Sequence, residues 1–322
     1  MRIAFQAAAA ALLAAAVVSA SPARAQDYPT SSIRLVIPFP PGGSTDLVGR
    51  LLAAYLGDQW KQTVVVDNKP GGNGMLGPTF AARSKPDGYT ILLAAPSIAT
   101  AVTSMKDMPI DPEKELEGVS QLIHTEYVVA VNSKLPVKTL KELIAYAKAN
   151  PGKLNYGSFA VGSRLTSEYF NSIAGVEITH VGYKGEALMV AAVASGEVQV
   201  GLATTVTLKE PAARGEVRIL AVTGDTRSKI FPDVPTAEEA GLPGFDTTVW
   251  FGLFAPAGTP PAIKNKIAAE VAKFVRQPDI IAKMEGAGLT PRASTPEAMS
   301  RYLSQDIKRA IETAKRAGIE PQ

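Results

Sequence analysis

The chain has 322 residues, of which 46% are hydrophobic and 20% are charged, a composition that lets a globular protein bury a sizeable core. It contains no cysteine, which excludes disulfide bonds, thiolate catalysis and cysteine metal sites. Its formal net charge is only +3, and its lysines and arginines are scattered along the sequence, which argues against a nucleic-acid partner.

Residues 1–25 have the pattern of a cleaved export signal. Arg2 precedes an apolar, alanine-rich run over residues 7–20, and Ala23 and Ala25 supply the small residues of a signal-peptidase site. The run is too short and too rich in alanine for a membrane anchor. We expect cleavage after Ala25 and an exported, soluble mature protein.

A strand, a glycine turn and a helix start are predicted within residues 33–46. Apart from Arg34, residues 33–37 are apolar and mostly β-branched, as in a buried strand, and three prolines then take the chain out of the sheet. The glycine pair at 42–43 permits positive φ, and residues 44–46 (Ser-Thr-Asp) are types that cap helix N-termini. Because a helix start directs N–H groups and partial positive charge at one point, this turn is a candidate anion site. The alternative is an ordinary turn between a strand and a helix.

Strands and helices alternate along the rest of the chain. A strand over 63–66, a helix over 76–83 and a strand over 89–95 complete a βαβαβ block, which predicts parallel strands with right-handed crossovers. Further elements are expected in this order: strand 127–131, helix 139–149, strand 154–158, helix 164–174, strand 176–180, helix 185–195, strands 198–203, 217–222 and 248–254, and helices 262–276, 279–285 and 296–317. The pattern is typical of an α/β protein.

Two predicted strands, 127–131 and 249–254, lie between blocks of strand–helix units, and we interpret them as crossing strands. A chain that enters a second domain and then returns makes two such crossings and leaves a cleft between the domains. We therefore predict a first domain from residues 26–126 and 249–322 and a second domain from residues 127–248.

A second glycine-flanked, serine-rich helix start occurs at residues 157–163. Like the first, it supplies N–H and O–H donors without a formal charge, and an anion could bridge the two if they face each other. For Ser163 the alternative is a plain helix cap. Arg164 is either a bidentate partner of a ligand carboxylate or a solvated arginine. Asp46 is interpreted as a helix cap or a brace for the glycine loop.

Three other motifs receive structural interpretations. The Gly-x-Gly-x-x-Gly pattern at 72–77 matches a dinucleotide fingerprint, but it follows the second strand and lacks an acid about 20 residues later, so no cofactor is expected. His124 and His180 are the only histidines and lack metal-binding spacing, so no metal site is expected and His180 is interpreted as structural. The aromatic residues in 250–254 are expected in the core rather than against a ligand.

Six short motifs carry a resemblance to a known family. In chain order they read PGGSTD from Pro41, VDNKPGGNG from Val66, PDGYT from Pro86, HVGYKG from His180, PTAE from Pro235 and FAPAGTP from Phe254. Over essentially the whole mature sequence, the chain resembles the Bug receptors, the substrate-binding proteins of tripartite tricarboxylate transporters. Six ordered motifs are far more specific than any one of them.

The resemblance implies a type II periplasmic-binding-protein fold, a Venus flytrap of two α/β domains, each a mostly parallel sheet flanked by helices. It implies a monomeric receptor, not an enzyme and without a cofactor, that captures a small carboxylate in the interdomain cleft. The ligand classes are di- and tricarboxylates, amino acids and aromatic acids, and the membrane partners are permease subunits of a tripartite tricarboxylate transporter. The alternatives are an extracytoplasmic sensor with a signalling partner and an exported hydrolase, although the sequence lacks a Gly-x-Ser-x-Gly elbow.

The resemblance also implies where the ligand binds. In the family, the loop after the first strand binds a carboxylate through backbone groups and ordered water, and loops of the second domain complete the pocket. The corresponding positions here are Phe39, Pro41, Gly42, Gly43, Ser44, Thr45, Asp46, Ser97, Ser158, Gly162, Ser163, Arg164, Thr204 and Thr205. The chain departs from the family pattern at residues 165–166 (Leu-Thr) and at Gly182, so the ligand of any one relative is not carried over.

Overall fold

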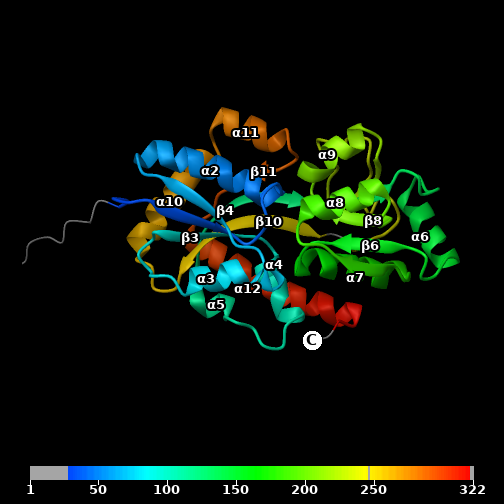
Figure 1. Ribbon diagram of the computed structural model, residues 1–322, viewed down its shortest axis with the longest axis horizontal. Coiled ribbons are helices and arrows are strands. Elements are labelled where there is room, and N and C mark those ends of the chain that lie inside the picture. The colour runs from blue at the N-terminus through cyan, green and yellow to red at the C-terminus, as the bar shows by residue number, and fades with distance from the viewer. Residues whose placement is uncertain (1–27, 246, 320–322) are drawn as a thin grey trace, which may run out of the picture. The chain divides into compact units, whose positions relative to one another are not determined.

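Two β-sheets with helices packed against them make up the architecture, which confirms the α/β class (Figure 1). The computed structural model describes residues 28–245 and 247–319, and from Ser31 onward these residues belong to one compact unit. The predicted export signal, residues 1–25, lies outside the described residues. Within the described ranges, no helix has the length and apolar content needed to cross a bilayer.

The first sheet has the strand order β11–β4–β10–β3–β1–β2. Its strands are β1 (Ile33–Ile37), β2 (Val64–Asn68), β3 (Thr90–Ala94), β4 (Leu116–Glu126), β10 (Thr248–Pro256) and β11 (Thr290–Pro291). β1 pairs in parallel with β2 and β3, whereas β10 runs antiparallel to β3 and β4. The apolar run predicted at 33–37 is thus an inner strand, and its buried side chains explain its β-branched composition.

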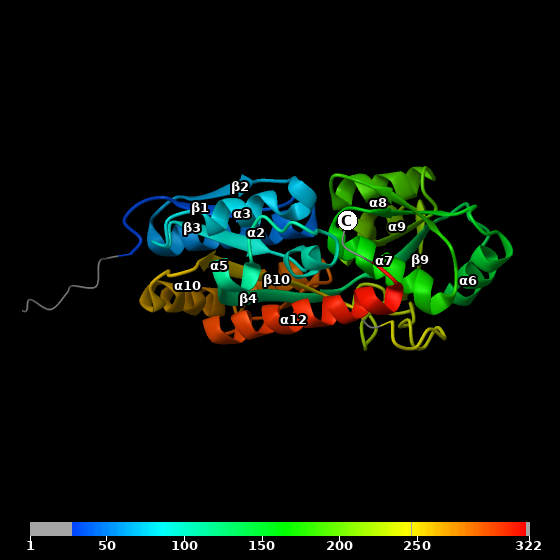
Figure 2. The same ribbon diagram turned by 90° about the horizontal axis from the view of Figure 1, so that it is seen from below.

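The helices that belong with the first sheet come from two parts of the chain, residues 44–115 and residues 261–317. They are α2 (Ser44–Trp60), η1 (Gly72–Gly74), α3 (Leu76–Ala82), α4 (Ser97–Thr100), η2 (Ala101–Thr103), α5 (Pro112–Glu115), α10 (Pro261–Phe274), α11 (Pro278–Glu285) and α12 (Pro296–Ala317). α12, red in Figure 2, packs along β4 and also contacts α7 (Val161–Ala174), a helix beside the second sheet. The C-terminal helix therefore connects both sheets.

The second sheet has the strand order β7–β6–β8–β5–β9. Its elements are β5 (Val128–Asn132), α6 (Leu140–Ala149), β6 (Asn155–Ser158), α7 (Val161–Ala174), β7 (Thr179–Gly182), α8 (Glu186–Ser195), β8 (Val200–Ala203), α9 (Thr205–Ala213) and β9 (Val217–Val222). β6 is parallel to β7 and β8, whereas β5 is antiparallel to β8 and β9. Both sheets are therefore mixed, and the prediction of mostly parallel sheets needs correction because β4, β5 and β10 pair antiparallel.

The chain crosses between the sheets at two neighbouring connections. β4 leads into β5 through Tyr127, and the return segment enters β10 beside Thr247. The buried Oγ1 of Thr223 joins them, because it lies 3.0 Å from the Tyr127 N–H nitrogen and 2.7 Å from the Thr247 carbonyl oxygen. The strands β5 and β10, which were predicted to cross between the domains, each lie within one sheet. The chain passes between the sheets at the peptides beside Tyr127 and Thr247 instead. The division into two domains at these points stays a prediction.

Trp250 of β10 belongs to the hydrophobic core that packs against the first sheet. Its side chain and that of Phe254 are fully buried, which confirms the prediction that this aromatic stretch belongs to the core. The indole Nε1 donates a hydrogen bond to Asp306 of α12 at 2.8 Å. A buried indole N–H needs an acceptor, so this bond fixes α12 against the sheet.

Candidate functional site

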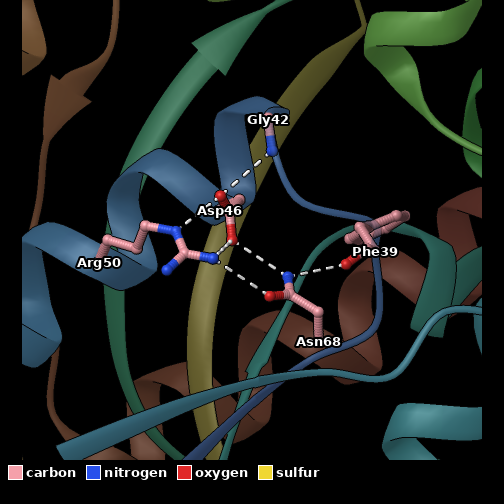
Figure 3. Close-up of polar contacts among 5 residues, drawn as sticks. All are labelled: Phe39, Gly42, Asp46, Arg50 and Asn68. Carbon is pink, nitrogen blue, oxygen red and sulfur yellow. Dashed lines mark hydrogen bonds and ion pairs between the residues drawn. The ribbon is translucent and has the colours of Figure 1, made fainter.

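The carboxylate of Asp46 holds the loop after β1 (Figure 3). Its oxygens accept hydrogen bonds from the Gly42 N–H at 3.1 Å, from Arg50 Nε and Nη2 at 2.9 and 3.0 Å, and from Asn68 Nδ2 at 3.0 Å. Asn68 Nδ2 also donates to the Phe39 carbonyl at 2.9 Å. Asp46 is therefore a brace for the glycine loop, as interpreted from the sequence. Its oxygens are used within the loop rather than offered to a ligand.

The Asp46 brace should make stability depend on pH. Burial raises the pKa of Asp46, but hydrogen bonds from Arg50, Asn68 and the Gly42 N–H outweigh burial and hold that pKa below its usual value of 3.8. A carboxylate whose pKa is lowered by folding stabilises the fold above its unfolded-state pKa. That stabilisation is lost as the pH falls through the lower, folded-state pKa.

We expect Asp46→Asn to lower the free energy of unfolding by about 1–2 kcal/mol at neutral pH. This is the range for hydrogen bonds to a charged group, reduced because Arg50 is half exposed and its charge is screened by solvent. Thermal unfolding of both proteins between pH 7 and about pH 3 should show the difference shrinking below about pH 4. A difference that does not change with pH would contradict this role for the charge.

The candidate anion site at the start of α2 holds a carboxylate of the protein itself. Ser44, the first residue of α2, donates to Glu186 Oε2 from its Oγ at 3.0 Å and from its N–H at 3.4 Å. From the second sheet, Thr204 donates its N–H and its Oγ1 to Glu186 Oε1, each at 2.7 Å. Glu186 was not among the site residues predicted from the sequence. Its signal would have been an acidic residue directly after Gly185, at the start of a helix.

A cleft of about 890 Å³ opens next to this carboxylate and is lined from both sheets. It contains three of the predicted binding residues: Phe39, Ser158 and Arg164. The other lining residues are Pro38, Pro40, Pro70, Gly71, Gly72, Asn73, Gly74, Ser104, Met105, Lys106, Asp107, Phe159, Ala160, Val161, His180, Gly182, Tyr183 and Lys184. The glycine-rich turn at 70–74 is thus a wall of the cleft, a role that was not predicted for it.

His180 pairs with Ser158 in the wall of the cleft. The distance between Ser158 Oγ and His180 Nε2 is 2.7 Å. Burial lowers the pKa of His180 and nearby Arg164 lowers it further, while Glu168 opposes them, so the imidazole is neutral at pH 7. The structural interpretation of His180 agrees with its partner Ser158, and the imidazole also lines the same cleft as the Arg164 guanidinium. The HVGYKG motif contains His180 together with Tyr183 and Lys184, and all three residues line the cleft.

Several predicted residues lie outside the cleft. Pro41, Gly43, Ser44 and Thr45 line a separate cavity of about 40 Å³ around Glu186. Gly42 lines a surface hollow beside α8.

The remaining predicted residues have partners within the protein. Ser163 Oγ accepts from the N–H groups of Phe159 and Ala160 and so caps α7. Thr205 Oγ1 donates to the Ala287 carbonyl at 2.7 Å. Ser97 and Gly162 mark the contact of α4 with the start of α7, where a Cβ on Gly162 would lie 3.7 Å from Ser97 N. Their contact with a ligand stays a prediction.

The described part of the chain contains no group of three His, Asp or Glu side chains arranged to hold a metal ion. The donors in the cleft are instead a guanidinium, lysine amines, hydroxyls and an imidazole, together with backbone groups of glycine turns. Such donors suit an organic anion.

Two mixed β-sheets with flanking helices, joined by two crossings and sharing a cleft, make up the fold that this chain shares with periplasmic solute-binding proteins. The chain belongs to the tripartite tricarboxylate transporter family receptors, because residues 48–319 match the family model of that description. This confirms the resemblance to the Bug receptors.

Three solved structures are closely similar to this chain. Rpa4515 of R. palustris, described with adipate, is 36% identical, with 92% of this chain and 100% of that chain covered and a TM-score of 0.89. The periplasmic binding protein BugD is 30% identical, with 92% and 100% covered and a TM-score of 0.87. MatC from Rhodopseudomonas palustris, with bound malate, is 28% identical, with 89% and 99% covered and a TM-score of 0.84.

Proposed function

We propose that the protein is a periplasmic receptor that captures a small carboxylate in the cleft and delivers it to a tripartite tricarboxylate-type membrane transporter. In this proposal residues 1–25 direct export, residues 26–126 with 249–322 and residues 127–248 are the two domains, and the peptides at Tyr127 and Thr247 are the hinge. The protein acts by binding, without catalysis. Its ligand is a di- or tricarboxylate, an amino acid or an aromatic acid.

One observation carries the proposal: the cleft gathers cationic and neutral donors from both sheets around about 890 Å³ of space. The Arg164 guanidinium can bind a carboxylate bidentately, and Ser158 and His180 lie in the same wall. Phe39 and the 70–74 turn contribute the opposite sheet's part of the lining. The adipate and malate described for two similar proteins support an organic acid as the ligand.

A thermal-shift panel tests the proposal. Adipate, malate, citrate, glutamate, benzoate and hexanoate are added in turn, with adipamide as an uncharged control of the same length. A ligand present at 100 times its dissociation constant adds about 2.7 kcal/mol to the free energy of unfolding. We expect at least one acid to raise the melting temperature while adipamide does not. If no acid stabilises the protein at millimolar concentration, the proposal is wrong.

Binding should also take up protons through His180. Because burial and Arg164 lower the pKa of His180 below its usual value of 6.5, the ring is neutral in the free protein at pH 7. A carboxylate beside it raises that pKa, so the affinity should increase as the pH falls through the window between the two pKa values. Calorimetry in two buffers of different ionisation heat should detect the uptake, and His180→Asn should abolish it. Undiminished uptake in the variant would exclude His180 as its source.

A second candidate function is hydrolysis, because Ser158 and His180 have the spacing of a nucleophile and its base. Tyr156 occupies the nearby carboxylate, since its hydroxyl donates to Glu168 Oε1 at 2.5 Å. Among the residues that the structure describes, no carboxylate is hydrogen-bonded to His180 as the third group that orients a catalytic histidine. We therefore expect no turnover of nitrophenyl esters above background. Turnover that Ser158→Ala removes would favour the hydrolase.

A further inference from the structure

The carboxylate of Glu186 lies where three helices begin. Glu186 is the first residue of α8, Ser44 is the first residue of α2, and Thr204 is the N-cap of α9. The oxygens of Glu186 accept two hydrogen bonds from Ser44, two from Thr204 and one from Thr207 Oγ1 at 3.1 Å. The residue is only 6% exposed. Within the described chain, all of these donors are neutral.

This arrangement is an anion site whose anion is supplied by the chain. Helix N-termini carry partial positive charge and offer N–H groups, so several that converge favour a carboxylate. A buried carboxylate is tolerated only when hydrogen bonds replace its lost hydration, and Glu186 receives such bonds from both sheets. The donors of Ser44 and Thr204 therefore have the chemistry expected of a receptor that binds a solute carboxylate. Their hydrogen bonds are already made to Glu186.

The Glu186 site adjoins the large cleft. Phe39, Pro40 and Phe159 line both the cleft and the small cavity that contains Glu186. The small cavity measures about 40 Å³, which is room for about one water molecule and not for a carboxylate with its carbon chain. A solute carboxylate beside Phe39 and Phe159 would therefore lie against residues that also enclose the buried carboxylate of Glu186.

We propose that Glu186 determines the specificity of the receptor: it excludes a carboxylate from the Phe39–Phe159 end of the cleft and so selects a solute with an uncharged end there. The inference rests on the proposed function of the cleft. The solute places its carboxylate at Arg164 and an apolar or aromatic tail against Phe39 and Phe159. A dicarboxylate that extends to the same wall is disfavoured by repulsion from Glu186 and by loss of hydration.

The test compares acids of equal carbon number by calorimetry: butyrate with succinate, and hexanoate with adipate. We expect the natural protein to bind the monoacid of a pair more tightly. Glu186→Gln keeps the shape and removes the charge, so it should shift the ratio of the two dissociation constants by about tenfold toward the diacid. Glu210→Ala, on the exposed face of α9, removes the same charge outside the site and should leave the ratio unchanged.

A second measurement does not depend on the solute. Glu186→Ala leaves the donors of Ser44 and Thr204 unpaired, so the melting temperature should fall by about 5 °C or more. Acetate at tens of millimolar should restore part of that loss, beyond any effect on the natural protein and on Glu210→Ala, with sodium chloride as the ionic-strength control. Absence of this rescue would show that the donors form no anion site and would overturn the inference.

The outcomes separate the two proposals. If the natural protein binds none of the four acids, and none in the larger panel, the proposed function fails. If it binds them and Glu186→Gln leaves the ratio of dissociation constants unchanged, the inference about Glu186 fails and the receptor function stands.

Discussion

Replacing Arg164 with alanine is expected to weaken binding of the most stabilising acid about 10- to 100-fold. Arg164 lies at the start of α7 and lines the cleft together with Ser158 and His180. A hydrogen bond to a charged group contributes about 1.5–3 kcal/mol, and each 1.4 kcal/mol is tenfold in affinity. Because the side chain is exposed to the cleft, its loss should change the melting temperature of the free protein little.

Calorimetry measures this effect, and Arg301→Ala is the matched control. Arg301 is an exposed arginine of α12 outside the lining of the cleft, so its removal gives the same change in net charge. Affinity should be unchanged in Arg301→Ala. Equal losses in the two variants would point to long-range attraction of the anion rather than to direct pairing with Arg164.

The largest effect on stability is expected from Gly288→Ala. Gly288 has φ +77°, a conformation that side chains rarely adopt, and an added Cβ would lie 2.0 Å from Thr205 Oγ1. Thr205 is fully buried and bonded to the Ala287 carbonyl, so it cannot move away without losing that bond. Backbone strain and overlap together should lower the free energy of unfolding by about 3 kcal/mol or more.

Gly258→Ala separates strain from overlap. Gly258 has φ +84°, close to that of Gly288, but a Cβ added there would have no neighbouring atom within 4 Å. It should cost about 1–2 kcal/mol, the strain of the left-handed conformation alone. Thermal unfolding of both variants provides the comparison. Equal losses would mean that the contact between Gly288 and Thr205 has no energetic consequence.

The local elements of this fold were predictable from sequence because their signals are local. The apolar run at 33–37, the glycine turn and the helix after it follow from side-chain type and spacing, and the structure has β1 and α2 there. The role of Asp46 was also predictable, because its partners Gly42 and Arg50 are four residues away on either side. Such contacts form wherever the helix forms.

The pairings over long sequence distances were not predictable. The strand β4 was not predicted; its antiparallel partners β10 and β11 come from the last third of the chain, far from it in sequence. Glu186 and Ser44 are 142 residues apart, and nothing near Glu186 in sequence indicates that it fills a site on α2. The pairing of His180 with Ser158 could not be predicted because the two residues come from neighbouring strands, β7 and β6. The sequence therefore indicates loops that supply hydrogen-bond donors, and only the fold shows that the Glu186 carboxylate accepts from two of them.

The most direct test of solute binding in the cleft uses the two histidines as internal probes. His180 lines the cleft, whereas His124 lies in β4 opposite Trp250, outside the lining. With nitrogen-15-labelled imidazoles, titration with the most stabilising acid of the panel should shift the His180 resonances toward the protonated form and leave those of His124 in place. If the acid binds and the His180 resonances do not move, or move no more than those of His124, the solute lies elsewhere and the assignment of the cleft is wrong.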